Sequence, residues 1–258
     1  MPSLSLIKPR PDLSGVKVLS RLSGDLRALQ NSLIVASDTP GAVSIDLPHD
    51  CHASPVEPVH DPRGRNVVYC AGPSGCGKST FARGFARRYR ELYPRRTICL
   101  ISRLDDDDTL ATGGELDLRR IKIASLVERP ATITEFRETL CIVDDVEGFG
   151  KAEAAAVQNL SEMIANLGRH EAVSLLYLSH QLTRGLQSRN LLSEAQVYVV
   201  FPGAASHNML RHLLTYYVGI DSSEVSKIKK LPSRWVAIHR TYPRCCIFDG
   251  GGFLLNSD

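Results

Sequence analysis

A glycine-rich segment carries the strongest chemical signal in this chain. It reads GPSGCGKST and therefore satisfies the pattern G-x-x-x-x-G-K-[ST]. Glycines let the backbone fold around an anion with successive N–H groups pointing inward. A helix that begins near Lys78 would aim the positive end of its dipole at the same point. We therefore expect a nucleoside triphosphate to bind here, through Gly72, Pro73, Ser74, Gly75, Cys76, Gly77, Lys78, Ser79 and Thr80.

A second signal is the apolar run LCIVDD, which ends in two carboxylates. A buried parallel strand reads as a continuous apolar run, and α/β sheets bind ligands at the carboxyl ends of such strands. We expect Asp144 and the Ser79 hydroxyl to hold Mg²⁺, while Lys78 reaches the β- and γ-phosphates of ATP. Asp145 would point the other way and polarise an attacking water. Glu147 is a reserve candidate for this base, since side-chain alternation puts it on the side of Asp145.

A third apolar run, at residues 175–178, is followed by Ser179, His180 and Gln181. The Gln181 amide is a candidate for a hydrogen bond to the γ-phosphate or to the lytic water, which would let it sense whether the phosphate is present. The competing interpretation of Gln181 is that it simply lies at the polar start of a loop. For Asp144 and Asp145, the competing interpretation is that they only cap the turn after their strand.

Arg169 follows Gly168, which we expect to end a helix. On an exposed corner, this arginine cannot easily fold back to the glycine loop of its own chain. It could instead serve a neighbouring subunit as a finger that stabilises the charge of a transferring phosphate. A cation that simply favours the helix dipole is the commoner meaning of such a residue, so the sequence leaves both interpretations open.

The elements that must position these residues alternate from residue 66 onward. Apolar strands are expected at 67–71, 97–102, 140–144, 174–179 and 196–201, and helices at 79–93, 151–167 and 206–217. Such alternation is typical of an α/β fold with a doubly wound, mostly parallel sheet, here a P-loop NTPase. Residues 235–248 predict a C-terminal β-hairpin.

The N-terminal part differs in composition, because eight of the fourteen prolines precede Arg63. We expect an irregular, proline-rich segment and linker over residues 1–65, in which residues 33–35 and 42–47 add at most a small strand pair. The P-loop domain, with its hairpin, would occupy residues 66–258.

Composition sets broader limits. The chain has 258 residues, 43% of them apolar and 23% charged, which is the range of soluble globular proteins. Its apolar runs are too short for a membrane span, and Met1–Pro11 offers no apolar stretch for a signal peptide. The seven cysteines are scattered, so we expect reduced thiols in a cytosol-like compartment.

The formal net charge of +3 does not by itself demand a nucleic-acid partner. Residues 225–248 nevertheless hold six basic side chains and no acidic one, with Trp235 and Tyr242 between them. Such a patch can neutralise the phosphates of a polynucleotide, although a solvated basic face is at least as common. The acidic run at residues 105–108 is most simply a loop.

Together, these motifs give a family resemblance. Residues 66–248 resemble the viral genome-packaging ATPases of the poxvirus type, in the FtsK–HerA superfamily of DNA pumps. The generic part of the resemblance is the glycine loop. The more specific part follows His170, and the resemblance as a whole rests on residues 72–80, 142–145, 168–170, 179–181, 183–202, 233–236 and 242–243.

The resemblance implies a homo-oligomeric ring, hexameric or pentameric, that hydrolyses ATP between subunits and moves double-stranded DNA into a capsid. It implies MgATP bound by Lys78, Ser79 and Asp144, with Asp145 activating the water, Gln181 as sensor and Arg169 as the finger that acts on a neighbour. Cellular relatives usually carry Glu in place of Asp145, so Asp145 and Glu147 both remain candidates for the base. The resemblance also implies a viral capsid or vertex protein as partner, and a location in the host-cell cytoplasm, at the viral factory, or in the virion.

Two other functions fit the glycine loop. A P-loop small-molecule kinase should carry an arginine-rich lid that binds the acceptor, and should lack a finger between subunits. A nucleotide-dependent scaffold would bind ATP without hydrolysing it. A response of ATP turnover to DNA would distinguish the motor from both.

Overall fold

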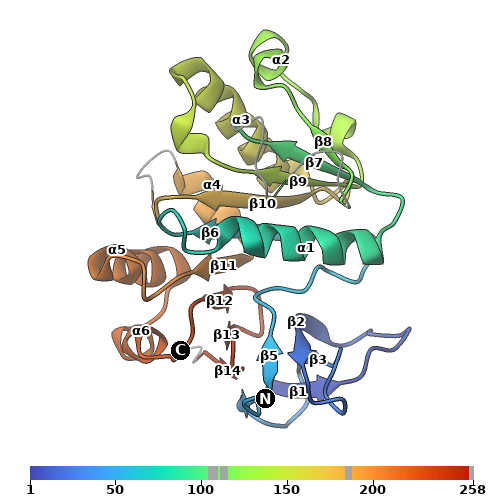
Figure 1. The fold of residues 1–258 in the computed structure, drawn as a ribbon, viewed down its shortest axis with the longest axis vertical. Coiled ribbons are helices and arrows are strands. Elements are labelled where there is room, and N and C mark those ends of the chain that lie inside the picture. Colours follow the sequence, from blue (N-terminus) through green and yellow to red (C-terminus); the bar gives the residue numbers. More distant parts are fainter. Residues whose placement is uncertain (104–109, 111–115, 184–187, 256–258) are drawn as a thin grey trace. The chain divides into compact units, whose positions relative to one another are not determined.

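The computed structural model describes residues 1–103, 110, 116–183 and 188–255 (Figure 1). The predicted acidic loop at residues 105–108, and Arg184 and Gly185 of the resemblance, lie outside the described residues. The chain divides into two compact units. We call Pro58–Gln196 the central unit, and we call Met1–Glu57 together with Val197–Asp258 the split unit.

The central unit is built on a parallel sheet of apolar, buried strands. The strand order is β6-β10-β9-β7-β8, and each neighbouring pair is parallel. The bounds are β6 Val67–Ala71, β7 Thr97–Ile101, β8 Leu118–Arg120, β9 Thr139–Val143 and β10 Ser174–Ser179. The predicted α/β fold with a mostly parallel sheet is therefore confirmed, and four of these five strands lie within one residue of the predicted positions.

Helices follow these strands as the alternation predicts (Figure 1). They are α1 Lys78–Leu92, α2 Ile123–Glu128, α3 Lys151–Leu167 and α4 Arg189–Glu194, with 3-10 turns at Ile133–Phe136 and Val146–Gly148. The α1 helix buries one apolar stripe that includes Phe81, Phe85 and Tyr89 at helical spacing. Both α1 and α3 contact β10, so the middle of the sheet is covered by these two helices.

The N-terminal residues of the split unit are not irregular, which corrects the prediction. They form an antiparallel sheet of order β1-β3-β2-β5, with bounds β1 Ser3–Ile7, β2 Lys17–Gly24, β3 Leu33–Ser37 and β5 Cys51–Ala53. The prolines before Arg63 all lie outside the strands, where they interrupt no ladder. Burial of Leu19, Leu22 and the run Leu33–Ala36 supplies the core of this sheet.

The C-terminal residues of the split unit confirm the hairpin and extend it. Antiparallel strands follow in the order β4-β14-β13-β12-β11, with bounds β4 Ser44–Asp46, β11 Val197–Val200, β12 Val236–His239, β13 Cys245–Phe248 and β14 Gly251–Leu254. The predicted helix at 206–217 is α5 His207–His212 continued by a π-helical turn, Leu213–Val218, and α6 spans Ser222–Lys229. Because β14 pairs with β4, the hairpin belongs with the N-terminal residues, so this division differs from the predicted boundary at residue 65.

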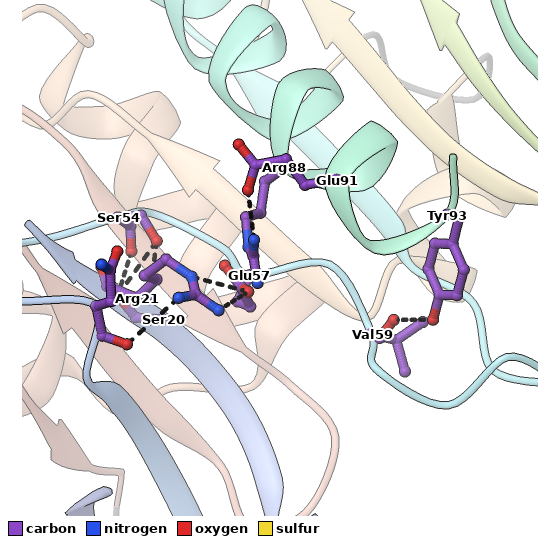
Figure 2. Close-up of polar contacts among 9 residues, drawn as sticks. Ser20, Arg21, Ser54, Glu57, Val59, Arg88, Glu91 and Tyr93 are labelled. Atoms are coloured by element: carbon purple, nitrogen blue, oxygen red, sulfur yellow. Dashed lines mark hydrogen bonds and ion pairs between the residues drawn. The ribbon is translucent and has the colours of Figure 1, made fainter. Parts of the chain in front are cut away.

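Polar contacts complete each unit (Figure 2). In the split unit, Arg21 forms an ion pair with the buried Glu57 at 3.0 Å, and the Ser20 hydroxyl donates to the Ser54 carbonyl at 2.7 Å. In the central unit, the Tyr93 hydroxyl donates to the Val59 carbonyl. This hydrogen bond holds the segment that precedes β6 next to the end of α1. Within the described residues, none of the helices has the length and apolar character needed to cross a bilayer.

Candidate nucleotide-binding site

The glycine loop joins the end of β6 to the start of α1, as predicted. Gly75 and Gly77 have φ values of +74° and +116°, in the region that glycine occupies without the cost that a Cβ imposes. Gly77 is the residue that immediately precedes α1. The N–H of Gly72 donates to the Ser179 carbonyl at 3.0 Å, which fixes the first residue of the loop to the neighbouring strand β10.

Lys78 is buried inside this loop, with only 5% of its surface exposed. Its Nζ donates to the carbonyl oxygens of Gly72 and Pro73 at 2.9 and 3.1 Å. A full positive charge and the positive end of the α1 dipole therefore lie together, against acceptors that carry only partial negative charge. Ser79 is half-buried and Thr80 is exposed on the first turn of α1. This arrangement is suited to an anion such as a phosphate group.

Asp144 lies at the carboxyl end of β9 and is 3% exposed. Its N–H donates to the Ile101 carbonyl at 2.9 Å, and its Oδ1 accepts from the Asp145 N–H at 2.9 Å. Cys70, one residue before the end of β6, has a thiol whose pKa depends on Asp144 and Lys78. Burial raises the pKa of Cys70 well above its usual value, with Cys76 and Asp144 raising it further and Lys78 opposing them.

The donor set of this region fits Mg²⁺. The Ser79 hydroxyl and the Asp144 carboxylate are hard oxygen ligands, which this ion prefers, and Mg²⁺ at phosphate sites is typically held by one or two protein groups plus the phosphates. In the described parts of the chain, no cluster of three or more His, Cys, Asp or Glu side chains could hold a metal ion.

The two candidate bases do not lie as strand alternation predicts. β9 ends at Val143, Asp145 has a φ of +54°, and a 3-10 turn begins at Val146. Side-chain alternation holds only within an extended strand, so the argument that put Glu147 on the side of Asp145 was wrong. Asp145 Oδ1 instead lies 2.6 Å from Nε2 of His180.

Glu147 contacts the chain after β10 through one oxygen. Its Oε1 accepts from the Ser179 hydroxyl at 2.7 Å and from the His180 N–H at 3.1 Å. Its Oε2 is buried and has no hydrogen-bond partner among the described residues. Both carboxylates thus lie at the turn that follows Asp144, and both contact His180.

Gln181 is held through its backbone, and its side chain is exposed. Its carbonyl accepts from the hydroxyls of Tyr69 and Ser179, at 3.0 and 2.8 Å. Because β10 lies between β6 and β9, Gln181 emerges between the glycine loop and the turn after Asp144. Its position suits the predicted sensor, and that role itself stays a prediction.

Arg169 lies away from these residues. It is exposed and follows Gly168, which ends α3 and donates its N–H to the Ile164 carbonyl at 2.9 Å. The corner precedes β10, so it lies at the amino edge of the parallel sheet, whereas the glycine loop lies at the carboxyl edge. The six residues of β10 separate these edges by about 20 Å at the usual rise per residue.

His180 and Ser179 are site residues that the sequence pattern alone does not single out. Both stand in the motif SHQ, but their contacts depend on β9 and β10 being neighbours, which spacing does not reveal.

The basic side chains of residues 225–248, in the split unit, partly make contacts within that unit. Lys227 lies over the Phe253 ring at 3.7 Å, and Arg244 donates to the Gly219 carbonyl at 3.0 Å. Lys230 and Arg234 are exposed.

A parallel sheet with a glycine loop between β6 and α1, a buried lysine in that loop and a carboxylate at the end of β9 defines the P-loop NTPase class of fold. No model of a known protein family matches the chain. The chain is 26% identical over 197 residues to "Uncharacterized protein V3" of Sputnik virophage, a match that covers 75% of this chain and 79% of the relative.

Solved structures are similar as well. The monomer of the pCW3 conjugation coupling protein TcpA, determined with ATPγS, matches with a TM-score of 0.52 and 10% identity, over 95% of this chain and 78% of TcpA. The genome-packaging NTPase B204 from Sulfolobus turreted icosahedral virus 2 has a TM-score of 0.47 and 16% identity, over 69% of this chain and 92% of B204. At 10% identity, the likeness to TcpA shows the fold alone.

Proposed function

We propose that this chain is an ATPase that drives double-stranded DNA into a viral capsid, with ATP hydrolysed between the subunits of a ring. The observation that carries the proposal is the burial of Lys78 within a glycine loop, on the same sheet edge as the buried Asp144. The loop that holds Lys78 suits a phosphate group, and a carboxylate oxygen such as those of Asp144 is a ligand that Mg²⁺ prefers. A triphosphate with Mg²⁺ is the ligand that complements both charges at once.

The residues of the carboxyl edge have distinct roles in this proposal. Loop N–H groups and Lys78 bind and neutralise the β- and γ-phosphates, and Ser79 with Asp144 would hold the ion. Bound Mg²⁺ would supply further neutralisation of charge on the phosphate oxygens. Asp145, with Glu147 as the alternative, orients a water and takes its proton, while Gln181 contacts the γ-phosphate or that water.

Arg169 is proposed to act on the nucleotide of a neighbouring subunit. Its position at the amino edge of the sheet, about 20 Å from the loop by strand length, supports this assignment because its side chain cannot span that distance. A guanidinium supplied by a neighbour stabilises the charge of the transition state and makes hydrolysis depend on assembly. Subunits would therefore form a ring, hexameric or pentameric, in which every site is shared.

Double-stranded DNA is the proposed polymer substrate. The exposed Lys230 and Arg234, in a segment without acidic residues, support contacts to its phosphates. A capsid or vertex protein would dock the ring, and the host-cell cytoplasm or the virion would be its location. These partners are proposed from the resemblance to packaging ATPases.

The test is the rate of ATP hydrolysis by the purified chain with and without linear duplex DNA. The proposal expects turnover that depends on Lys78, rises with DNA and loses its DNA response steeply as salt increases. Turnover that ignores DNA but responds to a nucleoside would indicate a kinase. ATP binding with no turnover under any of these additions would indicate a scaffold.

A further inference from the structure

One residue contacts both candidate bases of the proposed ATPase site. The ring Nε2 of His180 lies 2.6 Å from Asp145 Oδ1, and the backbone N–H of His180 donates to Glu147 Oε1 at 3.1 Å. Ser179 adds a 2.7 Å hydrogen bond from its hydroxyl to the same oxygen of Glu147. Two turns that are far apart in sequence are thereby joined at one point.

The sheet brings these turns together. β9 and β10 are parallel neighbours, with Val143 level with Tyr177, so the residues after each strand leave the sheet side by side. The Ser179 carbonyl also accepts from the N–H of Gly72, the first residue of the glycine loop. His180 is therefore one residue from a direct contact with the loop, on the edge where a nucleotide would bind.

The contacts with Ser179 and His180 fix the carboxylates of Asp145 and Glu147 but leave one oxygen of Glu147 without a partner among the described residues. Asp145 has φ +54°, a backbone conformation that an Asp tolerates but does not prefer, and its side chain is fixed through the ring of His180. Glu147 is fixed through Oε1, and its buried Oε2 has no partner among the described residues. A buried carboxylate oxygen without a donor is rare and costly, and a water delivered with the nucleotide would satisfy it.

We propose that His180 is a positioning residue for hydrolysis, which holds Asp145 through its ring and Glu147 through its backbone N–H. The ring fixes one carboxylate rotamer, so that the remaining oxygen atoms face the same attacking water. This inference rests on the proposed ATPase function. The motif SHQ alone gives no role to His180. In this proposal, the His180 ring donates a hydrogen bond and does not transfer a proton.

Two variants of matched size separate these functions of the ring. In His180→Gln, the amide N–H reaches about as far as Nε2 and can still donate to Asp145, whereas His180→Leu fills similar space without a donor. Outer-shell partners that orient metal ligands through hydrogen bonds commonly contribute about 10- to 100-fold to activity, and we expect a factor of similar size for a partner that orients a base. We expect His180→Leu to lower kcat by about that factor with ATP affinity unchanged, and His180→Gln to retain kcat within about threefold of the wild type.

A double-mutant cycle with Asp145→Asn tests the route of the effect. Asn tolerates the left-handed backbone conformation of residue 145, so this variant keeps the turn and removes the charge. If His180 acts through Asp145, adding His180→Leu to Asp145→Asn lowers kcat by less than about threefold further. Thermal unfolding of each variant controls for loss of fold.

Several results would overturn the proposal. A His180→Leu variant with wild-type kcat would remove any role of the ring, and losses that multiply in the double variant would show that His180 acts independently of Asp145. Equal losses in His180→Gln and His180→Leu would mean that the ring transfers a proton. A wild-type chain that neither binds nor hydrolyses ATP would contradict the proposed function itself, which is a different failure.

Discussion

The ammonium group of Lys78 donates a 2.9 Å hydrogen bond to the carbonyl oxygen of Gly72, the first residue of the glycine loop. The Pro73 carbonyl accepts a second bond from it at 3.1 Å. Both acceptors are neutral, so these bonds orient the cation without neutralising its charge. The loop is therefore organised around a buried positive charge that an incoming phosphate would pair with.

Replacement of this cation gives the first prediction. Lys78→Ala should abolish ATP binding or turnover, because the β- and γ-phosphates lose their main positive partner. Lys151→Ala, at the exposed start of α3, is a matched control that should leave both unchanged. Titration with a fluorescent ATP analogue and a phosphate-release assay measure the two effects. Wild-type affinity and turnover in Lys78→Ala would place the nucleotide elsewhere.

The two carboxylates after Asp144 give a second prediction. Asp145→Asn should leave ATP binding intact and slow hydrolysis by about 10²-fold or more, since general base catalysis contributes about 10²- to 10⁴-fold. Single-turnover kinetics with saturating enzyme measure the chemical step directly. A silent Asp145→Asn together with a slow Glu147→Gln would transfer the role of base to Glu147.

A third prediction concerns Arg169. Arg169→Ala should spare ATP binding and abolish DNA-stimulated turnover, because the guanidinium acts on a neighbour's nucleotide. Mixing Arg169→Ala subunits with Lys78→Ala subunits should restore part of the turnover, since each variant supplies the group that the other lacks. Mixtures that stay inactive while both variants co-assemble would argue against a shared site.

Arg65 leads to a fourth prediction, about stability. It donates to the carbonyls of Ile164 and Ala165, at 2.5 and 2.7 Å, and so satisfies the end of α3 just before Arg169. Arg65→Met keeps the apolar stem and removes both bonds, which should lower the free energy of unfolding by about 1–3 kcal/mol. Urea unfolding measures this change. Arg169→Ala, on the exposed corner, serves as the control and should be near neutral.

A fifth prediction follows from His239 in the split unit. Burial, together with the charge of Lys17, lowers the pKa of His239 well below its usual value of 6.5. Its Nε2 is buried without a hydrogen-bond partner among the described residues. Below pH 6.5, His239 therefore binds a proton in the unfolded chain but stays neutral in the folded chain. The free energy of unfolding consequently falls as the pH is lowered from 6.5.

Urea titrations between pH 7 and pH 5 measure this dependence. His239→Gln should reduce the slope by up to one proton, which is about 1.4 kcal/mol per pH unit. An unchanged slope in His239→Gln would mean that His239 is protonated in the folded protein.

The sequence predicted the β6–loop–α1 unit and α3 well, because a motif or a strong helical period marks each of them. It failed where the determining contact is distant or the backbone leaves a regular conformation. The positive φ of Asp145 ended the alternation on which the placement of Glu147 depended. The prolines before Arg63 concealed a buried antiparallel sheet. The contact between Asp145 and His180 required β9 and β10 to be neighbours, which the order of elements along the chain does not specify.

The most direct test of the account is the structure of the chain assembled on duplex DNA with a slowly hydrolysed ATP analogue, determined by electron cryo-microscopy. The account predicts a closed ring around the DNA, phosphates in the glycine loop within hydrogen-bond reach of Lys78, and the Arg169 guanidinium of a neighbour on the γ-phosphate. A glycine loop without nucleotide, or an Arg169 that turns away from every neighbouring site, would contradict it.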